Sequence, residues 1–363
     1  MKNSFGGSIT VTLFGESHGA AIGAVVDGLA PGIRIDDEYI KRRLDERRPQ
    51  GRISTARHEA DEYEIISGAF NGYTTGSPLT LVIRNTNTSS KDYSGLCDTP
   101  RPSHADYTAG GKYRGYQDYR GGGPFSGRVT AALVAVGAII RSALERKGIY
   151  IGTHVAQLHG VCDRGFSNVP EDIKALAAGG FPVLDEAARD EMIAVAEAAA
   201  ADGDSVGGVL ESAIIGVPAG VGEPWFDTLE GVLAHILFSV PAVKGVEFGA
   251  GFRMADMYGS EANDPFVTDG KSIATATNNN GGINGGISNG MPITFRVAVK
   301  PTPSIYKKQS TVSISEMKGC ELEIQGRHDP AIVHRARAVV DAVSAIALAD
   351  MLAIKYGTDW LGE

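Results

Sequence analysis

The stretch over residues 101–128 constrains the fold most, because it joins a loop-like composition directly to a long apolar run. It is dense in Gly, Arg, Tyr and His and poor in aliphatic residues, whereas residues 129–144 are mainly apolar. The apolar run predicts a core helix over residues 126–147 that buries one stripe of side chains. That stripe comprises Val129, Leu133, Val136, Ile140 and Leu144.

The join between this loop and the helix suits an anion. Glycines let a backbone approach an anion closely, and the first turn of a helix carries unpaired N–H groups and partial positive charge. Arg128 adds a permanently charged guanidinium at the same place. The pattern therefore predicts an oxyanion site, most simply for phosphate. A flexible surface loop before a core helix is the alternative that the composition leaves open.

Composition limits the classes of protein and partner. With 363 residues, 43% of them apolar, the chain can bury a substantial core in one large or two ordinary domains. The net charge of −9 argues against broad electrostatic binding to nucleic acid or an anionic membrane. The three cysteines lack metal-ligand spacing and favour a reducing compartment. With no signal-peptide pattern, and with residues 129–140 too short an apolar run to cross a bilayer, we expect a cytoplasmic protein.

A tight turn places a histidine between two predicted strands. Residues 8–14 alternate as a strand, and residues 21–26 form a second, more apolar strand. Gly15-Glu-Ser-His-Gly19 interrupts them, so that His18 lies next to an acid and a hydroxyl and between glycines. This setting makes His18 a candidate proton donor, with a solvated turn histidine as the alternative.

An arginine-rich helix follows. Asp36 or Asp37 can cap a helix that runs to about residue 48 and ends before Pro49. A basic rim that steers an anionic ligand inward, and a solvated face neutralised by Asp45 and Glu46, remain open as explanations. The arginines of this helix and of the loop after it are Arg42, Arg43, Arg47, Arg48, Arg52 and Arg57.

The rest of the chain mixes strands and helices without a regular repeat. Strands are predicted over residues 62–70, 78–84, 150–161, 206–217 and 291–299. Helices are predicted from Asp185 to residue 202, from Asp227 to before Pro241, and from Asp329 to about residue 356. In the last of these, Asp329 is predicted to be the N-cap with Pro330 at the first helical position.

Several of these segments suit proton transfer on an anionic substrate. Lys300-Pro-Thr-Pro-Ser304 ends a predicted strand with a cation and hydroxyls, which suits phosphate. The Gly-rich residues 277–290 match neither a dinucleotide fingerprint nor a P-loop. His18, His104 and Asp329 lack short helical ligand spacing, so no metal site is expected, and Ser17 lies in no nucleophile elbow.

Seven motifs stand in the order typical of one family, and they extend over most of the chain, from about residue 5 to residue 356. With them the chain resembles the chorismate synthases. The motifs are Gly15-Glu-Ser-His-Gly19, Arg101-Pro-Ser-His-Ala-Asp-Tyr-Thr108, Asp118-Tyr-Arg-Gly-Gly-Gly123, Ala242-Val-Lys-Gly-Val-Glu247, Gly281-Gly-Ile-Asn-Gly-Gly286, Lys300-Pro-Thr302 and Gly326-Arg-His-Asp-Pro330.

The resemblance implies the last step of the shikimate pathway, in which 5-enolpyruvylshikimate 3-phosphate loses phosphate to give chorismate. It implies reduced FMN as cofactor without net oxidation, with NADP as an associated nucleotide. The flavin would lend electron density to the allylic system as phosphate departs and recover it when the proton at carbon 6 is lost. The implied fold is α+β, one domain over residues 1–363, a β-α-β sandwich of antiparallel sheets and helices. A homotetramer and an external source of reduced flavin are also implied.

Matched motif by motif, the resemblance assigns roles to particular residues. His18 would protonate the leaving phosphate, His104 would act next to the reduced flavin, and Asp329 would help flavin N5 to remove the substrate proton. The substrate's carboxylates and phosphate would be held by Arg47, Arg52, Arg101 and Arg128. The FMN-binding residues would be Pro124, Phe125, Ser126, Pro241, Ala242, Gly285, Lys300, Pro301, Thr302, Pro303, Ser304 and Arg327.

One position departs from the family pattern. Many members continue Arg-Gly-Gly-Gly with an arginine and two small residues, whereas this chain has Pro124 and Phe125 before Ser126. Proline offers neither a charge nor a backbone N–H. A flavin contact at this position would therefore have to use the carbonyl, the ring or neighbouring residues.

Overall fold

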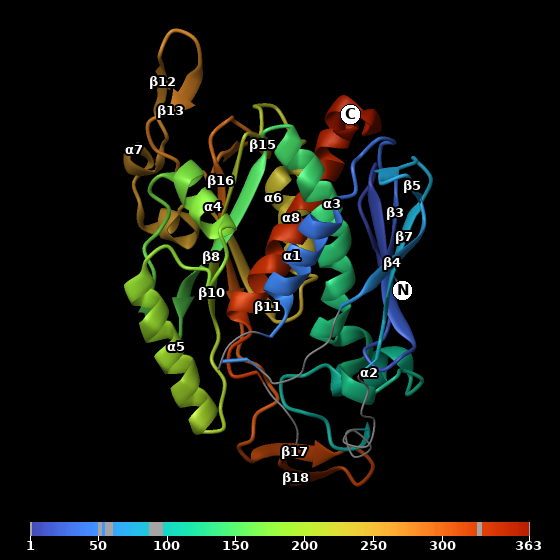
Figure 1. The fold of residues 1–363 in the computed structure, drawn as a ribbon. Helices are drawn as coiled ribbons and strands as arrows, with labels where there is room; N and C mark the ends of the chain where they lie inside the picture. Colours follow the sequence, from blue (N-terminus) through green and yellow to red (C-terminus); the bar gives the residue numbers. More distant parts are fainter. Residues whose placement is uncertain (1, 50–52, 55–60, 87–96, 325–328, 363) are drawn as a thin grey trace.

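Two five-stranded antiparallel sheets enclose a layer of helices in the computed structural model, which describes residues 2–49, 53–54, 61–86, 97–324 and 329–362 (Figure 1). The first sheet has the order β1-β2-β3-β7-β4, with β1 (Ser4–Phe5), β2 (Thr10–Gly15), β3 (Ala21–Asp27), β7 (Leu79–Arg84) and β4 (Tyr63–Ser67). The second has the order β11-β16-β10-β8-β9, with β11 (Val243–Phe248), β16 (Ile293–Val299), β10 (Gly208–Ile215), β8 (Tyr150–Leu158) and β9 (Val161–Cys162).

The helices divide into an inner and an outer set. The inner layer contains α1 (Asp37–Arg47), α3 (Thr130–Arg146) and α8 (Val333–Tyr356), with α6 (Leu229–Leu237) packed on α8 and β11. The outer face of the second sheet carries α4 (Val169–Ala177) and α5 (Glu186–Ala201). The β-α-β sandwich of antiparallel sheets that the family resemblance implies is thereby confirmed.

In the described part of the chain, two short helices and four two-stranded hairpins lie outside the two main sheets and the helices packed on them. The short helices are α2 (Asp106–Tyr113) and α7 (Gly259–Ala262). The two-stranded hairpins pair β5 (Ala69–Phe70) with β6 (Tyr73–Thr74), β12 (Phe266–Thr268) with β13 (Ile273–Thr275), β14 (Ile283–Asn284) with β15 (Ile287–Ser288), and β17 (Gln309–Ser313) with β18 (Lys318–Leu322). In Figure 1 the β12–β13 hairpin projects from one end of the molecule, while α2 and the β17–β18 hairpin lie at the other.

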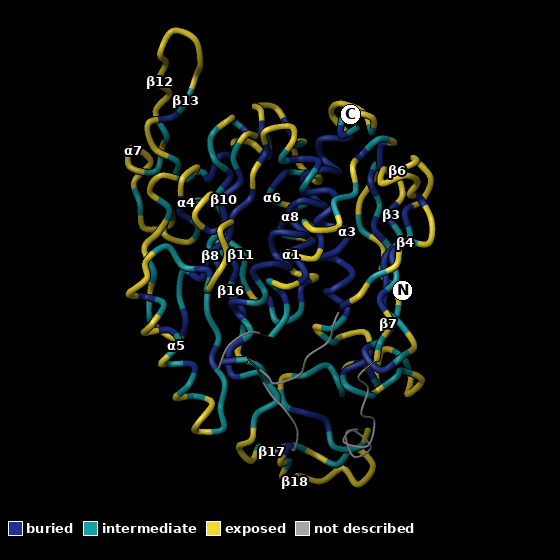
Figure 2. The backbone as a smooth tube through the Cα atoms, in the orientation of Figure 1, coloured by how far each residue is buried: buried dark blue, intermediate teal, exposed yellow. Residues whose placement is uncertain are grey.

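The inner helices are buried because they lie between two sheets (Figure 2). The predicted apolar stripe of α3 is buried, but so are nearly all its other faces. Among the described residues, Gly127–Arg146 is the one stretch long and apolar enough to cross a membrane, and 83% of it lies inside the fold. This is typical of the core helix of a soluble protein. Gly137 allows α3 to approach α8 closely, because a Cβ there would lie 2.6 Å from the Ala342 Cβ.

Two helix starts differ from the sequence prediction. The helix expected to open at Asp227 begins at Leu229, because the Thr228 hydroxyl caps it by accepting from the Gly231 N–H at 2.9 Å. The segment over residues 101–128 was expected to be loop, but it contains α2. Its two glycines, Gly110 and Gly111, are tolerated within that short exposed helix.

The prediction that Asp329 caps the last helix is wrong. This helix, α8, begins at Val333, and its cap position is Ile332. Tertiary pairing overrides the local Asp-Pro signal, because the Pro330 carbonyl accepts from the Val206 N–H at 2.8 Å and Ala331 forms a parallel bridge with Val206. The carboxylate of Asp329 is therefore available for a contact other than a helix cap.

Candidate functional site

A buried turn carries the first of the three candidate catalytic residues. His18 lies between β2 and β3, and it is buried, so the solvated-turn explanation is wrong. Its Nδ1 is 3.2 Å from the Ser17 hydroxyl. Ser17 joins this turn to the glycine-rich segment, since its N–H donates to the Gly123 carbonyl at 3.2 Å and its hydroxyl to the Arg120 carbonyl at 3.3 Å.

The glycine triplet Gly121–Gly123 brings the two candidate histidines together. Its three φ angles are 64°, 109° and 52°, all in the region that disfavours residues with a Cβ. A Cβ on Gly121 would lie 2.0 Å from His18 Cε1, and one on Gly122 would lie 3.5 Å from both Cε1 and Nε2 of His104. The two imidazole rings therefore lie against consecutive residues of one tight turn.

His104 is held by a carboxylate and an arginine from its own loop. Its Nδ1 is 2.7 Å from Asp106 Oδ1. Arg101 donates to Asp106 from its backbone N–H at 2.9 Å, and from Nε and an NH2 group at 2.8 Å each. Burial alone would raise the pKa of Asp106, but the hydrogen bonds from Arg101 and His104 hold that pKa well below its ordinary value.

A second buried carboxylate pairs with one arginine of α1 and with one in the short 3-10 turn just before α3. Asp61 accepts from Arg47 NH2 at 2.7 Å and from Arg128 NH1, and its side chain is fully shielded from solvent. Burial would raise the pKa of Asp61, but the charges of Arg47 and Arg128 outweigh it and lower that pKa. The solvated-face explanation is therefore wrong for Arg47, which points into the protein.

Asn85 links this arginine cluster to the histidine turn. Its side-chain amide donates to the Glu16 and Gly19 carbonyls at 2.9 Å each. Its Oδ1 accepts from Arg128 Nε at 3.1 Å. One amide thus fixes Arg128 relative to His18, because the two carbonyls flank that histidine.

Asp329 joins the cluster through Arg335. Arg335 NH1 lies 2.5 Å from Asp329 Oδ2, and Arg335 Nε donates to the Arg47 carbonyl at 2.9 Å. His18, His104 and Asp329 are thus linked indirectly, through a series of intervening residues, although their positions in the sequence are far apart. The contacts pass through the glycine triplet, Asn85, Arg128, Asp61, Arg47 and Arg335.

The lysine at the end of β16 reaches the same loop as His104. Lys300 Nζ donates to the Ser103 carbonyl and to its hydroxyl, the latter at 3.0 Å. The backbone N–H of Lys300 donates to the Ala242 carbonyl at 3.0 Å, which places Pro241 and Ala242 beside the segment from Lys300 to Ser304. Burial and the nearby charge of Lys244 lower the pKa of Lys300.

Four of the residues that the resemblance assigns to FMN binding have surroundings that the structure describes. The Thr302 hydroxyl oxygen is buried and has no hydrogen-bond partner among the described residues. Ser126 is already used as a cap, accepting from the Arg128 N–H at 3.2 Å, and the Phe125 ring packs edge-on against Tyr113 at 6.2 Å. Pro124 lies beside them within the turn that follows the glycine triplet.

The structure does not bring every predicted residue to this cluster. Gly285 lies in the β14–β15 hairpin, beside the start of β16, whereas Lys300 follows the other end of that strand. A seven-residue strand extends about 20 Å, so Gly285 is remote from the cluster within one chain. Arg52 and Arg327 lie outside the described residues.

Comparison with known proteins identifies the family. The chorismate synthase family model matches residues 9–353. The chain belongs to the chorismate synthase family. It is 49% identical over 345 residues to chorismate synthase of Thermococcus gammatolerans, covering 95% of this chain and 96% of that protein. It is 47% identical over 361 residues to the Dehalococcoides mccartyi enzyme, covering 98% of each.

A solved structure agrees with the family assignment. A crystal structure of chorismate synthase superposes on this chain with a TM-score of 0.75 at 30% identity. The match covers 98% of this chain and 94% of the other. The fold implied by the chorismate synthase resemblance is therefore confirmed by topology and by a solved relative.

Four residues of this cluster escaped prediction, namely Asp61, Asn85, Asp106 and Arg335. Asp106 stands two residues after His104 within a motif, so a His-x-Asp spacing could have indicated it. Asp61 and Asn85 carry no such signal, because their partners come from segments 14 to 69 positions away. Arg335 was not predicted because Asp329 was expected to cap the helix, and a capping carboxylate would not need an arginine partner.

Proposed function

We propose that this chain converts 5-enolpyruvylshikimate 3-phosphate into chorismate and phosphate, as a carbon–oxygen lyase at the end of the shikimate pathway. Family membership over residues 9–353 supports the reaction. The observation that carries the assignment of residues is the contact path that joins His18, His104 and Asp329 through the arginine cluster. An elimination needs an acid for the leaving group and a base for the proton, and both lie on this path.

The residues have two kinds of role: His18 and Asp329 transfer protons, and the arginines bind anionic groups. His18 donates a proton to the departing phosphate from a buried turn that fixes its ring. Asp329, braced by Arg335, takes part in removing the proton at carbon 6. Arg47 and Arg128 hold the anionic groups of the substrate, and the buried Arg47 Nε has no partner among the described residues. Arg52 belongs to this set by motif alone.

The residues present fit reduced FMN. The buried Thr302 hydroxyl, which has no hydrogen-bond partner within the part of the chain that the structure describes, and the adjacent Lys300 ammonium offer a polar group and a positive charge beside the His104 loop. When bound, the reduced flavin supplies electron density to the allylic system as phosphate leaves. We assign the protein side of this site to Pro124, Phe125, Ser126, Pro241, Ala242, Lys300, Pro301, Thr302, Pro303 and Ser304, and by motif alone to Arg327, which lies outside the described residues.

A homotetramer in the cytoplasm that receives reduced flavin from elsewhere completes the proposal. Because Gly285 is remote from Lys300 within one chain, its FMN contact would have to come from a second copy. The β12–β13 hairpin offers exposed apolar surface for assembly, since Phe266 is 73% and Ile273 is 74% exposed. NADP is proposed to be an associated nucleotide without a step of its own in the elimination.

An anaerobic assay tests the reaction. Purified protein with the phosphorylated substrate and chemically reduced FMN is expected to release one phosphate per chorismate formed, and none without reduced flavin. Substrate binding without phosphate release would indicate a phosphate-binding module instead. Activity that a chelator abolishes and that is indifferent to flavin would indicate a metal-dependent lyase.

Alanine at either of two proposed catalytic positions is expected to slow this reaction. His104→Ala and Asp329→Ala should each lower kcat by about 10²-fold, the loss typical of a positioned acid or base. The matched control is His159→Ala, because His159 lies on an exposed turn outside the cluster. Near-normal turnover in either variant, with the fold retained by circular dichroism, would refute the role of that residue.

A further inference from the structure

The environment of His104 fixes which ring nitrogen carries the proton. Its Nδ1 lies 2.7 Å from Asp106 Oδ1 and 3.0 Å from an Arg101 NH2 group. The two neighbours require opposite roles of Nδ1: an ionised carboxylate only accepts, so Nδ1 must donate to it, whereas a guanidinium only donates, so Nδ1 must accept from it. The proton is on Nδ1 if Asp106 is its partner, and on Nε2 of a neutral ring if Arg101 is.

The carboxylate decides between the two tautomers. A lone pair on Nδ1 would face the negative charge of Asp106 Oδ1 at 2.7 Å, which is repulsive. The same Arg101 NH2 group already donates to Asp106 Oδ1 at 2.8 Å, so it does not need the imidazole as an acceptor. The short contact is therefore an Nδ1–H donating to Asp106.

The other edge of the ring faces the glycine triplet. A Cβ on Gly122 would lie 3.5 Å from both Cε1 and Nε2, and Gly122 has none. With Nδ1 protonated, Nε2 of the neutral ring carries the lone pair on this side. Nε2 is thus the nitrogen that can take and return a proton.

We propose that Asp106 is a positioning residue that keeps the proton on His104 Nδ1 and presents Nε2 as the working nitrogen. This inference rests on the proposed function for its effect on turnover, but not for the tautomer itself. Arg101 acts through Asp106: its backbone N–H, Nε and one NH2 group all donate to that carboxylate. In this proposal Arg101 holds Asp106 in place, instead of the substrate group that the family resemblance assigns to it.

The spectroscopic test needs no substrate or cofactor. In protein labelled with ¹⁵N-histidine, the His104 signals are assigned by their loss in His104→Gln. At a pH at which the ring is neutral, the expected spectrum shows a protonated Nδ1, coupled to its own hydrogen, and an unprotonated Nε2. A spectrum with the hydrogen on Nε2 and the lone pair on Nδ1 would overturn the proposal, whatever reaction the protein catalyses.

The kinetic test separates positioning from binding. Asp106→Asn retains the shape of the side chain but removes its charge, so kcat should fall by about 10²-fold or more while the substrate KM stays within about threefold. Arg101→Lys should show the same split, because an ammonium cannot reproduce the paired donors of a guanidinium. If Arg101→Lys raised KM about tenfold or more at unchanged kcat, Arg101 would be a substrate-binding residue, and its proposed role in holding Asp106 would be overturned. Unchanged kcat in Asp106→Asn would overturn the role of Asp106.

Discussion

Alanine at position 121 is expected to lower kcat by about 10³-fold, because its methyl group would occupy the space that the His18 imidazole now fills. The added Cβ would lie 2.0 Å from His18 Cε1, 2.1 Å from its Nδ1 and 2.9 Å from the Ser17 hydroxyl. The ring must therefore leave its place, and with it goes the proposed proton donor to the departing phosphate. Steady-state kinetics under anaerobic conditions with reduced FMN measure the loss.

Two neighbouring glycines provide matched controls for this prediction. Gly115 has a φ of 83° and open space around its Cβ position, so Gly115→Ala imposes similar backbone strain without a clash. It should keep near-normal turnover. Gly122→Ala places its methyl at an ordinary contact distance of 3.5 Å from His104 and should fall between the two. If Gly121→Ala turned over as fast as Gly115→Ala, the tight packing of His18 against the triplet would have no catalytic importance.

The sequence predicts those parts of the fold in which local pattern and tertiary structure agree. Alternation and apolar runs identify β2, β3, β7, β10 and β16 to within a few residues, and Asp36 and Asp185 cap α1 and α5 as expected. Each of these elements buries one face, and the spacing of apolar residues in the sequence shows which face it is. The arrangement of the two sheets around the helices came from family resemblance and not from periodicity.

The error at the start of the last helix has a physical cause, which is competition from a distant partner. The Asp329-Pro330 pair is a strong local start signal, yet pairing with Val206 keeps the chain extended and delays α8 to Val333. The same displacement gives Asp329 its contact with Arg335. A prediction from local pattern cannot include a partner over 120 positions away, and here that partner converts an expected cap into a candidate catalytic group.

In the candidate site, the sequence likewise fails to locate the carboxylates that pair with the arginines. The motifs predict that His18, His104 and the arginines share one pocket, but they do not indicate the carboxylates that pair with these side chains. Asp61 and Asp106 each pair with predicted anion-binding arginines. Burying guanidinium groups without a counter-charge is costly, so internal carboxylates near such a cluster are a physical requirement that the sequence does not locate.

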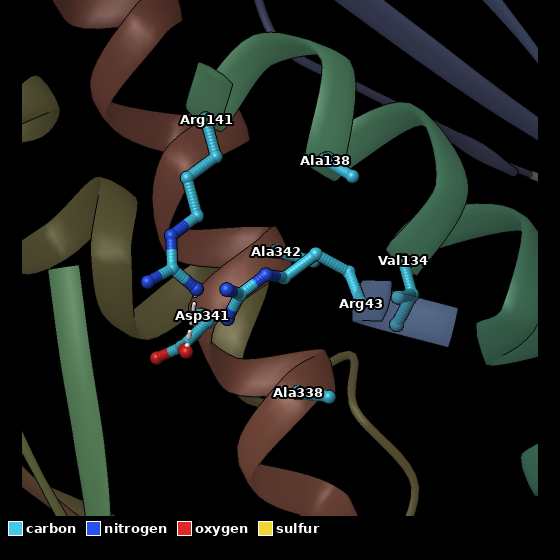
Figure 3. Close-up of a pocket in the computed structure, with 8 residues that line it drawn as sticks. Arg43, Val134, Ala138, Arg141, Ala338, Asp341 and Ala342 are labelled. Carbon is cyan, nitrogen blue, oxygen red and sulfur yellow. Dashed lines mark hydrogen bonds and ion pairs between the residues drawn. The ribbon is translucent and has the colours of Figure 1, made fainter. Parts of the chain in front are cut away.

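Removing one carboxylate from the helix layer should have the largest effect on stability. Asp341 on α8 accepts from Arg141 NH1 of α3 at 2.8 Å and from the Thr153 hydroxyl of β8 at 2.6 Å. Both charged side chains are almost completely buried, at 5% and 2% exposure. In Figure 3, Arg43 of α1 also reaches toward Asp341, so this carboxylate lies where three helices meet.

Asp341→Ala is therefore expected to lower the free energy of unfolding by about 3–5 kcal/mol, because it leaves the buried Arg141 with only the more exposed Glu145, at 3.2 Å, as an ion-pair partner. Urea denaturation at one fixed protein concentration measures the change. The control is Glu321→Ala, whose ion pair with Lys308 is exposed at both ends and should contribute nothing measurable. In the double variant Arg141→Met/Asp341→Leu, at least half of the loss should be recovered, since neither charge then remains unpaired. A loss below about 1 kcal/mol in Asp341→Ala would mean that water or a rearranged Arg141 satisfies the cation, and that this ion pair does not hold α3 and α8 together.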